Sequence, residues 1–321
     1  MSAAKAATWG IVTTVKAPMR DVLNFVAWHV ELGAHRIYVH LDTPDPECQA
    51  ALKAHPKVRV TQTGAGYWDK QGGKAPAKHQ VRQTRNATRI LARTAEVDWL
   101  AHVDVDEFII ADAPVGETLA ALADTTQVAR LRPVEALAPP PNSPAGPEWM
   151  CKAMSVERPK RRAQTDRIYG AYARGLDGGF LSHVAGKIFV STSLAGAEFR
   201  IHNVIVDGVQ NPNHAELGGL ALCHMHAPDA ETWLAHYRFR HDRGSYRSEL
   251  KPPRPSEDGG MTLHQMLSAI EADDGKDGLR AFFQSACTAT PDLCAALRAE
   301  GLLRRVMLDL DAARAGQFPG Y

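Results

Sequence analysis

Residues 97–110 read Val-Asp-Trp-Leu-Ala-His-Val-Asp-Val-Asp-Glu-Phe-Ile-Ile. The stretch begins with an apolar, strand-like run, continues with the three carboxylates of Asp104, Asp106 and Glu107, and ends with apolar residues. Burying carboxylates beside a core strand is costly unless a cation compensates their charge. Because side chains alternate along an extended segment, Asp104 and Asp106 point to the same side. Two oxygen ligands at a strand end suit Mg²⁺ or Mn²⁺, which keep positions open for substrate phosphates. The flanking residues favour this metal site over a solvated strand end whose acids cap a turn.

Composition is that of an ordinary globular protein. The 321 residues are 45% hydrophobic and 23% charged, with a formal net charge of +1, so no global charge favours nucleic acid as a partner. The odd number of cysteines, five in all, and the absence of a CxxC pair indicate reduced thiols. Residues 1–9 lack the pattern of a signal peptide, and no apolar run approaches membrane-spanning length. We therefore expect a cytoplasmic protein without an integral membrane segment, which a membrane surface could still recruit as a peripheral partner.

The first half of the chain alternates strand and helix patterns. Strands are expected at residues 8–15, 36–41, 58–63 and 99–104, and helices at residues 20–32 and 78–95. This order predicts an α/β fold with a mostly parallel sheet and helices on both faces. Ligands of such sheets bind beyond the carboxyl ends of the strands. The polar residues at or just after those ends are Thr13, Thr14, Lys16, Asp42 and Asp104.

The pattern changes after Val134. Five prolines lie within residues 139–147, and the basic run at 158–162 follows; both are interpreted as loop rather than core. Further strands are expected at 184–192, 199–206 and 220–225. Helical spacing resumes at Met261 and ends in a helix expected at about 293–313.

Several segments together carry a family resemblance. They are Thr14-Val15-Lys16, residues 25–29 and 31–33, the strand at 37–42, the helix with Gln80, Gln83 and Asn86, and the string from Asp98-Trp99-Leu100 to Asp104-Val105-Asp106-Glu107-Phe108. His183 before Gly186-Lys187, and His236-Tyr237, extend the pattern. The chain resembles glycosyltransferases of the GT-A fold, nearest to their family-2-like and family-92-like branch, over roughly residues 9–250. It departs from them at Ala17-Pro18, where the family has Asn-Glu.

The resemblance implies a Rossmann-like GT-A fold. A catalytic domain is then expected at 1–250, with a nucleotide-binding part at about 8–112, an acceptor part at about 126–250, and a C-terminal helical extension at 251–321. The implied activity is transfer of a sugar from a nucleotide diphosphate donor to a glycan or lipid-linked acceptor, with inversion of configuration.

The residues are compatible with this chemistry. A metal held by Asp104 and Asp106 stabilises the charge that develops on a departing nucleoside diphosphate. His224 and His226 share one face of an extended segment, so either can complete the metal or phosphate site or simply fill a polar position at a strand end. Asp42 can bind the donor's base or ribose, or cap a turn.

Basic residues recur along the helix expected at 78–95. Lys78, Arg82, Arg85, Arg89 and Arg93 form one stripe at three- and four-residue spacing. Lys78 and Arg82, near its start, are candidates for donor phosphates, whereas Arg89 and Arg93 are expected to be solvated. Thr14, Lys16 and Lys187 are further phosphate candidates. The run at 158–162 suits an acidic glycan or lipid headgroups.

An inverting transferase needs a base for the acceptor hydroxyl. The candidates for this base are Glu107, Asp177 and Glu216. Asp177 is favoured because it precedes the flexible Gly178-Gly179, beside which an acceptor could bind. Glu107 can instead orient the metal ligands.

Two other functions stay open. A sugar-phosphate nucleotidyltransferase would normally show a glycine-rich phosphate loop, which residues 8–20 lack. A non-catalytic carbohydrate-binding protein could keep the fold without turnover. A dehalogenase-type phosphatase is disfavoured, because Glu107-Phe108 replaces the hydroxyl residue of its motif.

Overall fold

The computed structural model describes residues 5–93, 96–141, 143 and 146–321. The chain forms two compact units. Unit 1 comprises Met1–Arg132, Ala185–Leu222 and Asp309–Tyr321, and unit 2 comprises Pro133–Val184 and Cys223–Leu308. The division into a catalytic domain at 1–250 and an extension at 251–321 stays a prediction.

The elements of each unit follow in chain order. Unit 1 contains β1 (Trp9–Val15), α1 (Met19–Glu31), β2 (Arg36–Leu41), α2 (Pro46–Ala54), β3 (Val58–Gln62), α3 (Ala65–Asp69), α4 (His79–Ala92), β4 (Trp99–His102), β5 (Glu107–Ala111), α5 (Val115–Ala120), β8 (Lys187–Ser191), β9 (Glu198–Phe199), β10 (Val204–Val206), β11 (Val209–Gln210) and α10 (Leu310–Gln317). Unit 2 contains β7 (Glu148–Lys152), α6 (Arg158–Tyr169), η1 (Gly170–Arg174), α7 (Ala230–Asp242), η2 (Ser256–Asp258), α8 (Leu263–Cys287), α9 (Pro291–Ala299) and β13 (Leu303–Met307). Strands β6 (Val128–Ala136) and β12 (His214–His224) each begin in unit 1 and end in unit 2.

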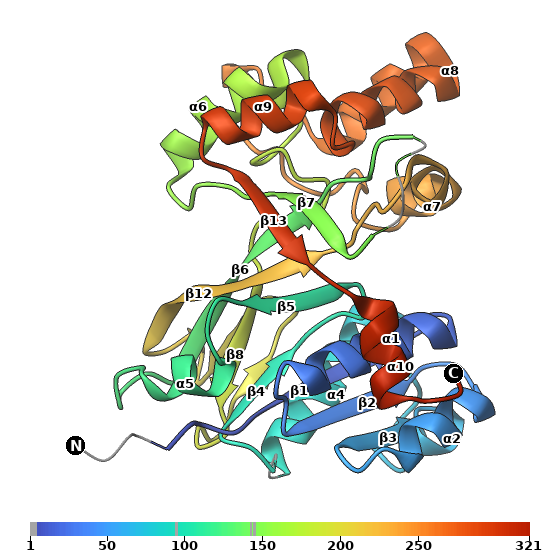
Figure 1. The fold of residues 1–321 in the computed structure, drawn as a ribbon, viewed down its shortest axis with the longest axis vertical. Coiled ribbons are helices and arrows are strands. Elements are labelled where there is room, and N and C mark those ends of the chain that lie inside the picture. Colours follow the sequence, from blue (N-terminus) through green and yellow to red (C-terminus); the bar gives the residue numbers. More distant parts are fainter. Residues whose placement is uncertain (1–4, 94–95, 142, 144–145) are drawn as a thin grey trace. The chain divides into compact units, whose positions relative to one another are not determined.

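The sheet of unit 1 has a parallel half and an antiparallel half. Strands β3, β2, β1 and β4 lie in this order and are all parallel. Beyond β4, strand β8 and the start of β6 pair antiparallel. The expected α/β fold class is thereby confirmed, and its Rossmann-like part is the four-stranded parallel half (Figure 1).

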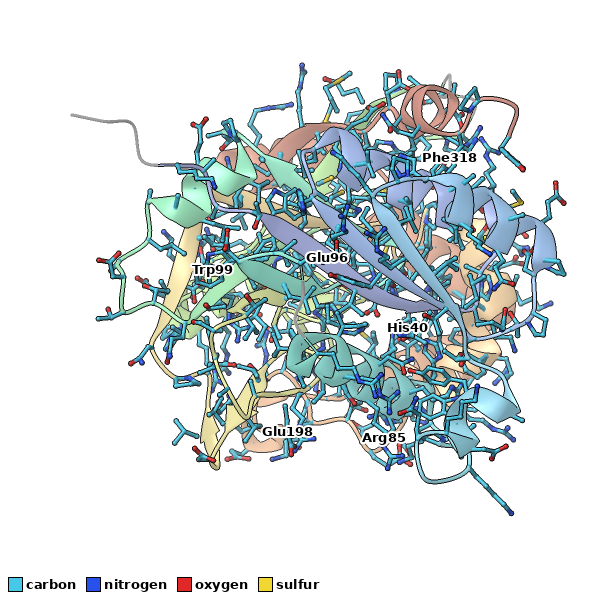
Figure 2. The ribbon with its side chains drawn as sticks, turned by 90° about the horizontal axis from the view of Figure 1, so that it is seen from below. His40, Arg85, Glu96, Trp99, Glu198 and Phe318 are labelled. Carbon is cyan, nitrogen blue, oxygen red and sulfur yellow. The ribbon has the colours of Figure 1, made fainter. Side chains whose placement is uncertain are left out.

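Helices cover both faces of the parallel strands. α1 packs with α10, the red C-terminal helix that returns to unit 1 and lies beside it (Figure 1). On the opposite face lies α4 (Figure 2). Its Ala87 and Leu91 share a buried apolar cluster with Val12, Tyr38 and Leu100. Because side chains alternate along each strand, every second residue of β1, β2 and β4 faces α4.

Unit 2 has a core of its own. Its helices bury a cluster of large apolar side chains, which includes Trp233, Tyr246, Phe282 and Phe283. The end of β6 pairs with β7, and β7 pairs with β13, all antiparallel.

Two sequence expectations fail in unit 2. The basic run at 158–162, expected as loop, is the first part of helix α6, which has a proline in its first turn, a position that suits proline. The helix expected at 293–313 is instead α9, strand β13 and α10. Gly301, at φ +70°, follows α9 in a conformation that ends helices, and pairing with β7 makes residues 303–307 a strand.

Among the described residues, no helix combines the length and the apolar character needed to cross a membrane.

Candidate functional site

The carboxyl ends of β1, β2 and β4 present polar side chains to helix α4. On each strand the residues that face α4 begin apolar and end polar: Val12 then Thr14, Tyr38 then His40 and Asp42, and Leu100 then His102 and Asp104. α4 shows the matching change of character. Its first half offers polar residues at helical spacing (His79, Arg82, Gln83 and Asn86), and its second half offers Ala87 and Leu91. The local patterns of four elements therefore converge on one polar site within unit 1.

Lys187 is the centre of the acidic end of this site. Its side chain is 1% exposed, and its Nζ lies 2.8 Å from Asp104 Oδ2 and 3.4 Å from Oε2 of Glu107. Burial alone lowers the pKa of a lysine, but the charges of Asp104 and Glu107 outweigh burial and raise the pKa of Lys187 above its ordinary value. Lys187 is therefore a fixed positive charge that compensates the two acids.

Further hydrogen bonds fix the turn that carries these acids. Gln83 Nε2 donates to Oδ1 of Asp104. The Asp104 amide donates to Glu107 Oε2 at 3.0 Å, and the Glu107 amide donates to the Asp104 carbonyl at 3.0 Å. Glu107 itself is fully buried. This geometry makes Glu107 an orienting group for the Asp104–Glu107 turn.

His29 joins α1 to the segment that follows the turn. Its Nδ1 lies 2.7 Å from the Phe25 carbonyl, and the Ile109 amide donates to its Nε2 at 3.2 Å. The carbonyl requires a proton on Nδ1 and the amide requires a bare Nε2, so the ring is neutral. Burial lowers the pKa of His29 to about 4, against smaller raising effects of Phe25 and Glu107.

Asp42, the candidate for base or ribose binding, is held by Arg82 and His79. Arg82 donates to both of its carboxylate oxygens, with Nη2 at 2.6 Å, and His79 Nδ1 lies 3.2 Å away. Burial alone would raise the pKa of Asp42, but its contacts with Arg82 and His79 hold the pKa below the ordinary value. Asp42 is therefore an ionised acceptor near the end of β2.

Thr14 belongs to a second chain of hydrogen bonds. Asn86 Nδ2 donates to the Thr14 hydroxyl at 3.0 Å, and the Tyr67 hydroxyl donates to Asn86 Oδ1 at 2.7 Å. Arg89 in turn donates to the Tyr67 hydroxyl at 2.6 Å. Arg89, expected to be solvated, is thus tied to the end of β1 through two side chains.

The remaining unit 1 candidates are more open to solvent. Lys16 and Lys78 are exposed, and Asp106 is half-buried. Burial chiefly raises the pKa of Asp21, Arg20 lowers it, and the negative charge of Asp106 raises it further. The charges of Asp21 and Asp106 therefore interact, and carboxylate oxygens are the ligands that a hard divalent cation prefers.

His224 and His226 lie together in unit 2. Their ring centroids are 5.1 Å apart, and the His183 ring is 5.5 Å from that of His224. His226 Nε2 shares a hydrogen bond of 2.7 Å with the Tyr246 hydroxyl, which also accepts from the Trp233 indole. Metal binding by either histidine stays a prediction.

Asp177, the favoured candidate base, begins a tight turn in unit 2. Gly178 and Gly179 have φ of +64° and +81°, as in type I′ turns, and the Phe180 amide donates to the Asp177 carbonyl. A Cβ on Gly179 would lie 2.2 Å from the Tyr169 ring. Arg161 Nε donates to Asp177 Oδ1 at 2.7 Å. The turn is thus rigid, contrary to the flexibility that Gly178-Gly179 suggests.

A buried ion pair anchors this turn. Lys152 Nζ lies 3.0 Å from Oε1 of Glu135 and donates to the Gly179 carbonyl at 2.6 Å. Glu135 also accepts from the amides of Leu181 and Ser182. Burial would raise the pKa of Glu135, but Lys152 and these hydrogen bonds lower it.

A cavity in unit 2 lies beside Asp177, with a volume of about 1000 Å³. Its described lining includes six cationic side chains, namely Arg158, Arg161, Arg162, Arg247, Lys251 and Arg254, against the carboxylates of Asp166 and Asp177. Apolar residues such as Phe180 and Leu263 line the same space.

Glu216, the third candidate base, belongs to unit 1, where Arg132 binds both of its carboxylate oxygens.

Sequence reasoning missed Asp21, Tyr67, Glu135 and Lys152. For Glu135 and Lys152 a local signal existed, since each is a charged residue with apolar residues on both sides in the sequence, which indicates a buried pair. Nothing in the sequence marks Asp21 or Tyr67, because their partners come from distant segments.

Comparison with known proteins gives weak structural matches only. No family model and no curated protein matches the chain. Among solved structures, the crystal structure of HddC from Yersinia pseudotuberculosis matches with 9% identity and a TM-score of 0.37, over 73% of this chain and 99% of that one. The glycosyltransferase GlyE in Streptococcus pneumoniae TIGR4 matches with 9% identity and a TM-score of 0.29, over 89% of this chain and 46% of that one. Because both TM-scores lie below 0.5, we base no functional conclusion on either match.

Proposed function

We propose that this protein is a metal-dependent, inverting glycosyltransferase that moves a sugar from a nucleotide diphosphate donor to a glycan or lipid-linked acceptor. The observation that carries the proposal is the convergence of Thr14, Asp42 and Asp104 at the carboxyl ends of three neighbouring strands, opposite the polar half of α4. Parallel α/β sheets bind nucleotides at this edge.

The donor is bound by groups of different chemistry along this edge. Asp42, held ionised by Arg82, accepts hydrogen bonds from the ribose or the base. Thr14 and the exposed Lys16 and Lys78 lie where donor phosphates need hydrogen-bond donors and positive charge. Arg82 and Lys187 support the site indirectly, because their charges are directed to Asp42 and Asp104.

Asp106 and Asp104 are the residues that would hold Mn²⁺ or Mg²⁺, with His224 or His226 as further ligands. Gln83 and Lys187 already contact the two carboxylate oxygens of Asp104. The ion would supply charge stabilisation for the departing nucleoside diphosphate. Lys187, Gln83 and Glu107 keep the acidic turn in place whether or not an ion is bound.

The acceptor is assigned to the cavity of unit 2, with Asp177 as the base. The anchored turn presents the Asp177 carboxylate at the cavity wall. Glu107 is the weaker candidate, because it is fully buried against Lys187 and the Asp104 amide. The cationic lining suits an acceptor with an anionic group, and a peripheral membrane contact follows if that acceptor is a lipid. The reaction would take place in the cytoplasm.

The test is turnover of a panel of nucleotide sugars by the full chain, with Mn²⁺ and with EDTA. We expect nucleoside diphosphate release that EDTA abolishes and Mn²⁺ restores. Asp106→Ala should lower kcat about a hundredfold or more, as for loss of a preorganised electrostatic group, whereas the exposed control Asp124→Ala should not.

Other outcomes would identify the alternatives. Release of pyrophosphate from a nucleoside triphosphate and a sugar phosphate would identify a nucleotidyltransferase. Sugar binding without turnover would identify a binding protein, and full activity in EDTA would contradict metal dependence. For the base, Asp177→Asn should lower kcat while donor binding persists; a stalled Glu107→Gln enzyme beside an active Asp177→Asn enzyme would reverse the assignment.

A further inference from the structure

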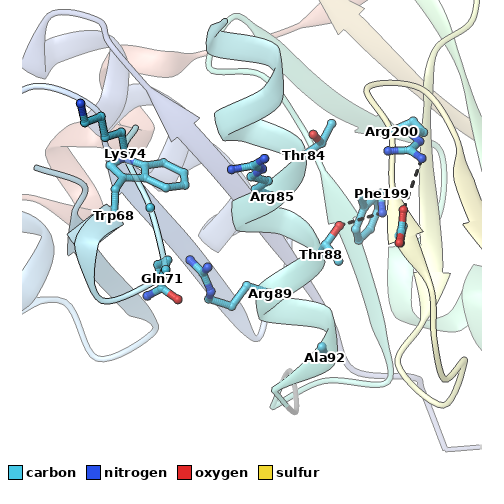
Figure 3. A pocket seen from close by; sticks show the side chains of 13 residues that line it. Trp68, Gln71, Lys74, Thr84, Arg85, Thr88, Arg89, Ala92, Phe199 and Arg200 are labelled. Atoms are coloured by element: carbon cyan, nitrogen blue, oxygen red, sulfur yellow. Dashed lines mark hydrogen bonds and ion pairs between the residues drawn. The ribbon is translucent and has the colours of Figure 1, made fainter. Parts of the chain in front are cut away.

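A second cavity lies wholly within unit 1, on the outer side of helix α4. Its volume is about 640 Å³, a size typical of small-molecule sites. Its walls come from the end of α3 and the loop after it, from α4, and from β9 with the residue after it (Figure 3). Arg85 and Glu198 lie on the side of α4 away from the parallel strands (Figure 2).

This cavity is separate from the strand-end site. The cavity-lining residues of α4 are Thr84, Arg85, Thr88, Arg89 and Ala92, and the residues that face the strand ends are His79, Arg82, Gln83 and Asn86. At about 100° per residue the mean directions of the two sets differ by about 140°, although Arg82 and Arg89, seven residues apart, lie on nearly the same side. Neither Asp42 nor Asp104 lines the cavity.

The charges around the cavity are mostly positive. Among the described lining residues, Lys74, Arg85, Arg89 and Arg200 are cationic and Glu198 is the one carboxylate. Glu198 pairs with Arg200 at 3.3 Å. Within the described part of the chain, Lys74 and Arg85 have no hydrogen-bond or ion-pair partner. Three cationic charges thus remain without a matching anion, which favours an anionic ligand.

Parts of the wall are already fixed in place. Arg89 is held by its hydrogen bond to the Tyr67 hydroxyl and stacks over that ring at 5.3 Å. The Thr88 hydroxyl accepts from the Phe199 amide at 2.9 Å, which ties β9 to α4. A guanidinium held in this way loses little conformational entropy when an anion binds.

The aromatic residues of the cavity narrow the ligand class. Trp68 and Phe199 are both buried, so their rings offer no exposed platform for stacking. Recognition must therefore come from the cations and the hydroxyls of the wall. Arginine guanidinium groups bind phosphate through paired hydrogen bonds.

We propose that this outer cavity of α4 is a second binding site, which takes a small phosphate-bearing molecule. The site is independent of the proposed transferase activity. Arg85 and Arg200 hold the phosphate from opposite walls, and Lys74 and Arg89 add charge.

The experiment is calorimetric titration of the full chain with inorganic pyrophosphate in EDTA. Three double variants are compared: Arg85→Gln/Arg200→Gln in the cavity, Lys5→Gln/Lys53→Gln as a control that removes the same charge from exposed positions of unit 1, and Lys16→Gln/Lys78→Gln, which removes the same charge at the strand ends. We expect binding to weaken about tenfold or more in the cavity variant, in line with the loss of charge-assisted hydrogen bonds, and to change less than about twofold in the other two.

Each remaining outcome overturns the proposal. Equal weakening in the cavity and control variants would mean diffuse attraction to a basic surface. Loss of binding in Lys16→Gln/Lys78→Gln would place pyrophosphate at the strand ends. Absence of binding to the unaltered chain would leave the cavity without a phosphate ligand. None of these results depends on whether sugar transfer is observed.

Discussion

At the residue scale, a buried ammonium holds the acidic turn together. Lys187 is on a strand whose neighbours Ile188, Phe189 and Val190 are all buried, and its charge is balanced by Asp104 and Glu107 from a segment 83 residues away. A buried pair of this kind contributes little net stability over apolar packing, but removal of one partner leaves an uncompensated charge.

We therefore expect Lys187→Met to destabilise unit 1 by about 3–5 kcal/mol, because the buried Glu107 and the partly buried Asp104 lose their cation. Urea unfolding followed by tryptophan fluorescence measures the effect. In a Glu107→Gln background Lys187→Met should be less destabilising, since one of the two carboxylates left without a cation is then neutral. A cost below about 1 kcal/mol in the unaltered background would contradict a charged, buried cluster.

His29 predicts a dependence of stability on pH. Its pKa is about 4 in the folded chain and about 6.5 in an unfolded one. Between these values the unfolded chain binds more protons, so stability is complete above about pH 6.5 and is lost as the pH falls toward 4, by up to about 3 kcal/mol for this group. Burial likewise lowers the pKa of His40 to about 4, so the two effects act in the same direction.

The measurement is the urea midpoint as a function of pH. His29→Asn removes the titrating ring, so the loss of stability between pH 6.5 and 4 should be smaller by the contribution of His29, up to about 3 kcal/mol. An unchanged slope in that variant would show that His29 does not titrate across unfolding.

At the scale of elements, the turn at 177–180 depends on one glycine for two reasons. Gly179 has a positive φ, and Tyr169 occupies the space that a Cβ would need. Gly301, in the same unit, has a similar φ of +70° but nothing within 4 Å of a Cβ. Comparing substitutions at these two glycines therefore separates the effect of backbone strain from that of steric overlap.

We expect Gly301→Ala to cost about 1 kcal/mol from backbone strain alone, and Gly179→Ala to cost about 2–3 kcal/mol more because Tyr169 must move. Thermal or urea unfolding of both variants gives the comparison. Tyr169→Phe would not relieve the overlap, since ring carbons also lie within 2.3 Å of the added Cβ. In a Tyr169→Ala background, by contrast, Gly179→Ala should be less destabilising. Equal costs at the two glycines would show that the turn adjusts freely.

At the scale of the molecule, the two units are interleaved along the chain. The last segment, Asp309–Tyr321, belongs to unit 1, although the 86 residues before it, Cys223–Leu308, belong to unit 2. Helix α10 returns to pack on α1, with Arg314 bonded to Asn24 and Asp311 to Arg20. Phe318 is 4% exposed, against the ring of His55, and Tyr321 is 50% exposed.

Phe318→Ala should therefore destabilise unit 1 by about 3 kcal/mol, the lower range for loss of a buried phenylalanine side chain. Tyr321→Ala, three residues further on, is the matched control and should change stability by less than about 0.5 kcal/mol. Denaturant unfolding of both variants tests whether α10 is an integral part of unit 1. Equal small effects would mean that unit 1 is stable without it.

Local sequence patterns predicted the elements of the parallel half to within a few residues. β1, α1, β2, β3 and β4 follow strand or helix periodicity closely, and the strand ends follow from the change of apolar to polar residues. The patterns failed at β13, because residues 303–307 are a strand through pairing with β7, a segment far away in the sequence. They also failed at 158–162, where a charged, solvated helix face carries no apolar period.

The sequence alone placed Asp42, Asp104 and Asp106 at strand ends, because the order of local elements sets the edge at which a parallel sheet presents its polar residues. Only the tertiary structure decided what each of these residues contacts. Lys187 was expected near phosphates and lies against Asp104 and Glu107; Asp177 was expected beside a flexible Gly-Gly and lies in a turn fixed by Lys152 and Tyr169. The physical reason is that hydrogen bonds and ion pairs at strand ends join segments far apart in the chain, and no periodicity within a segment specifies its distant partner.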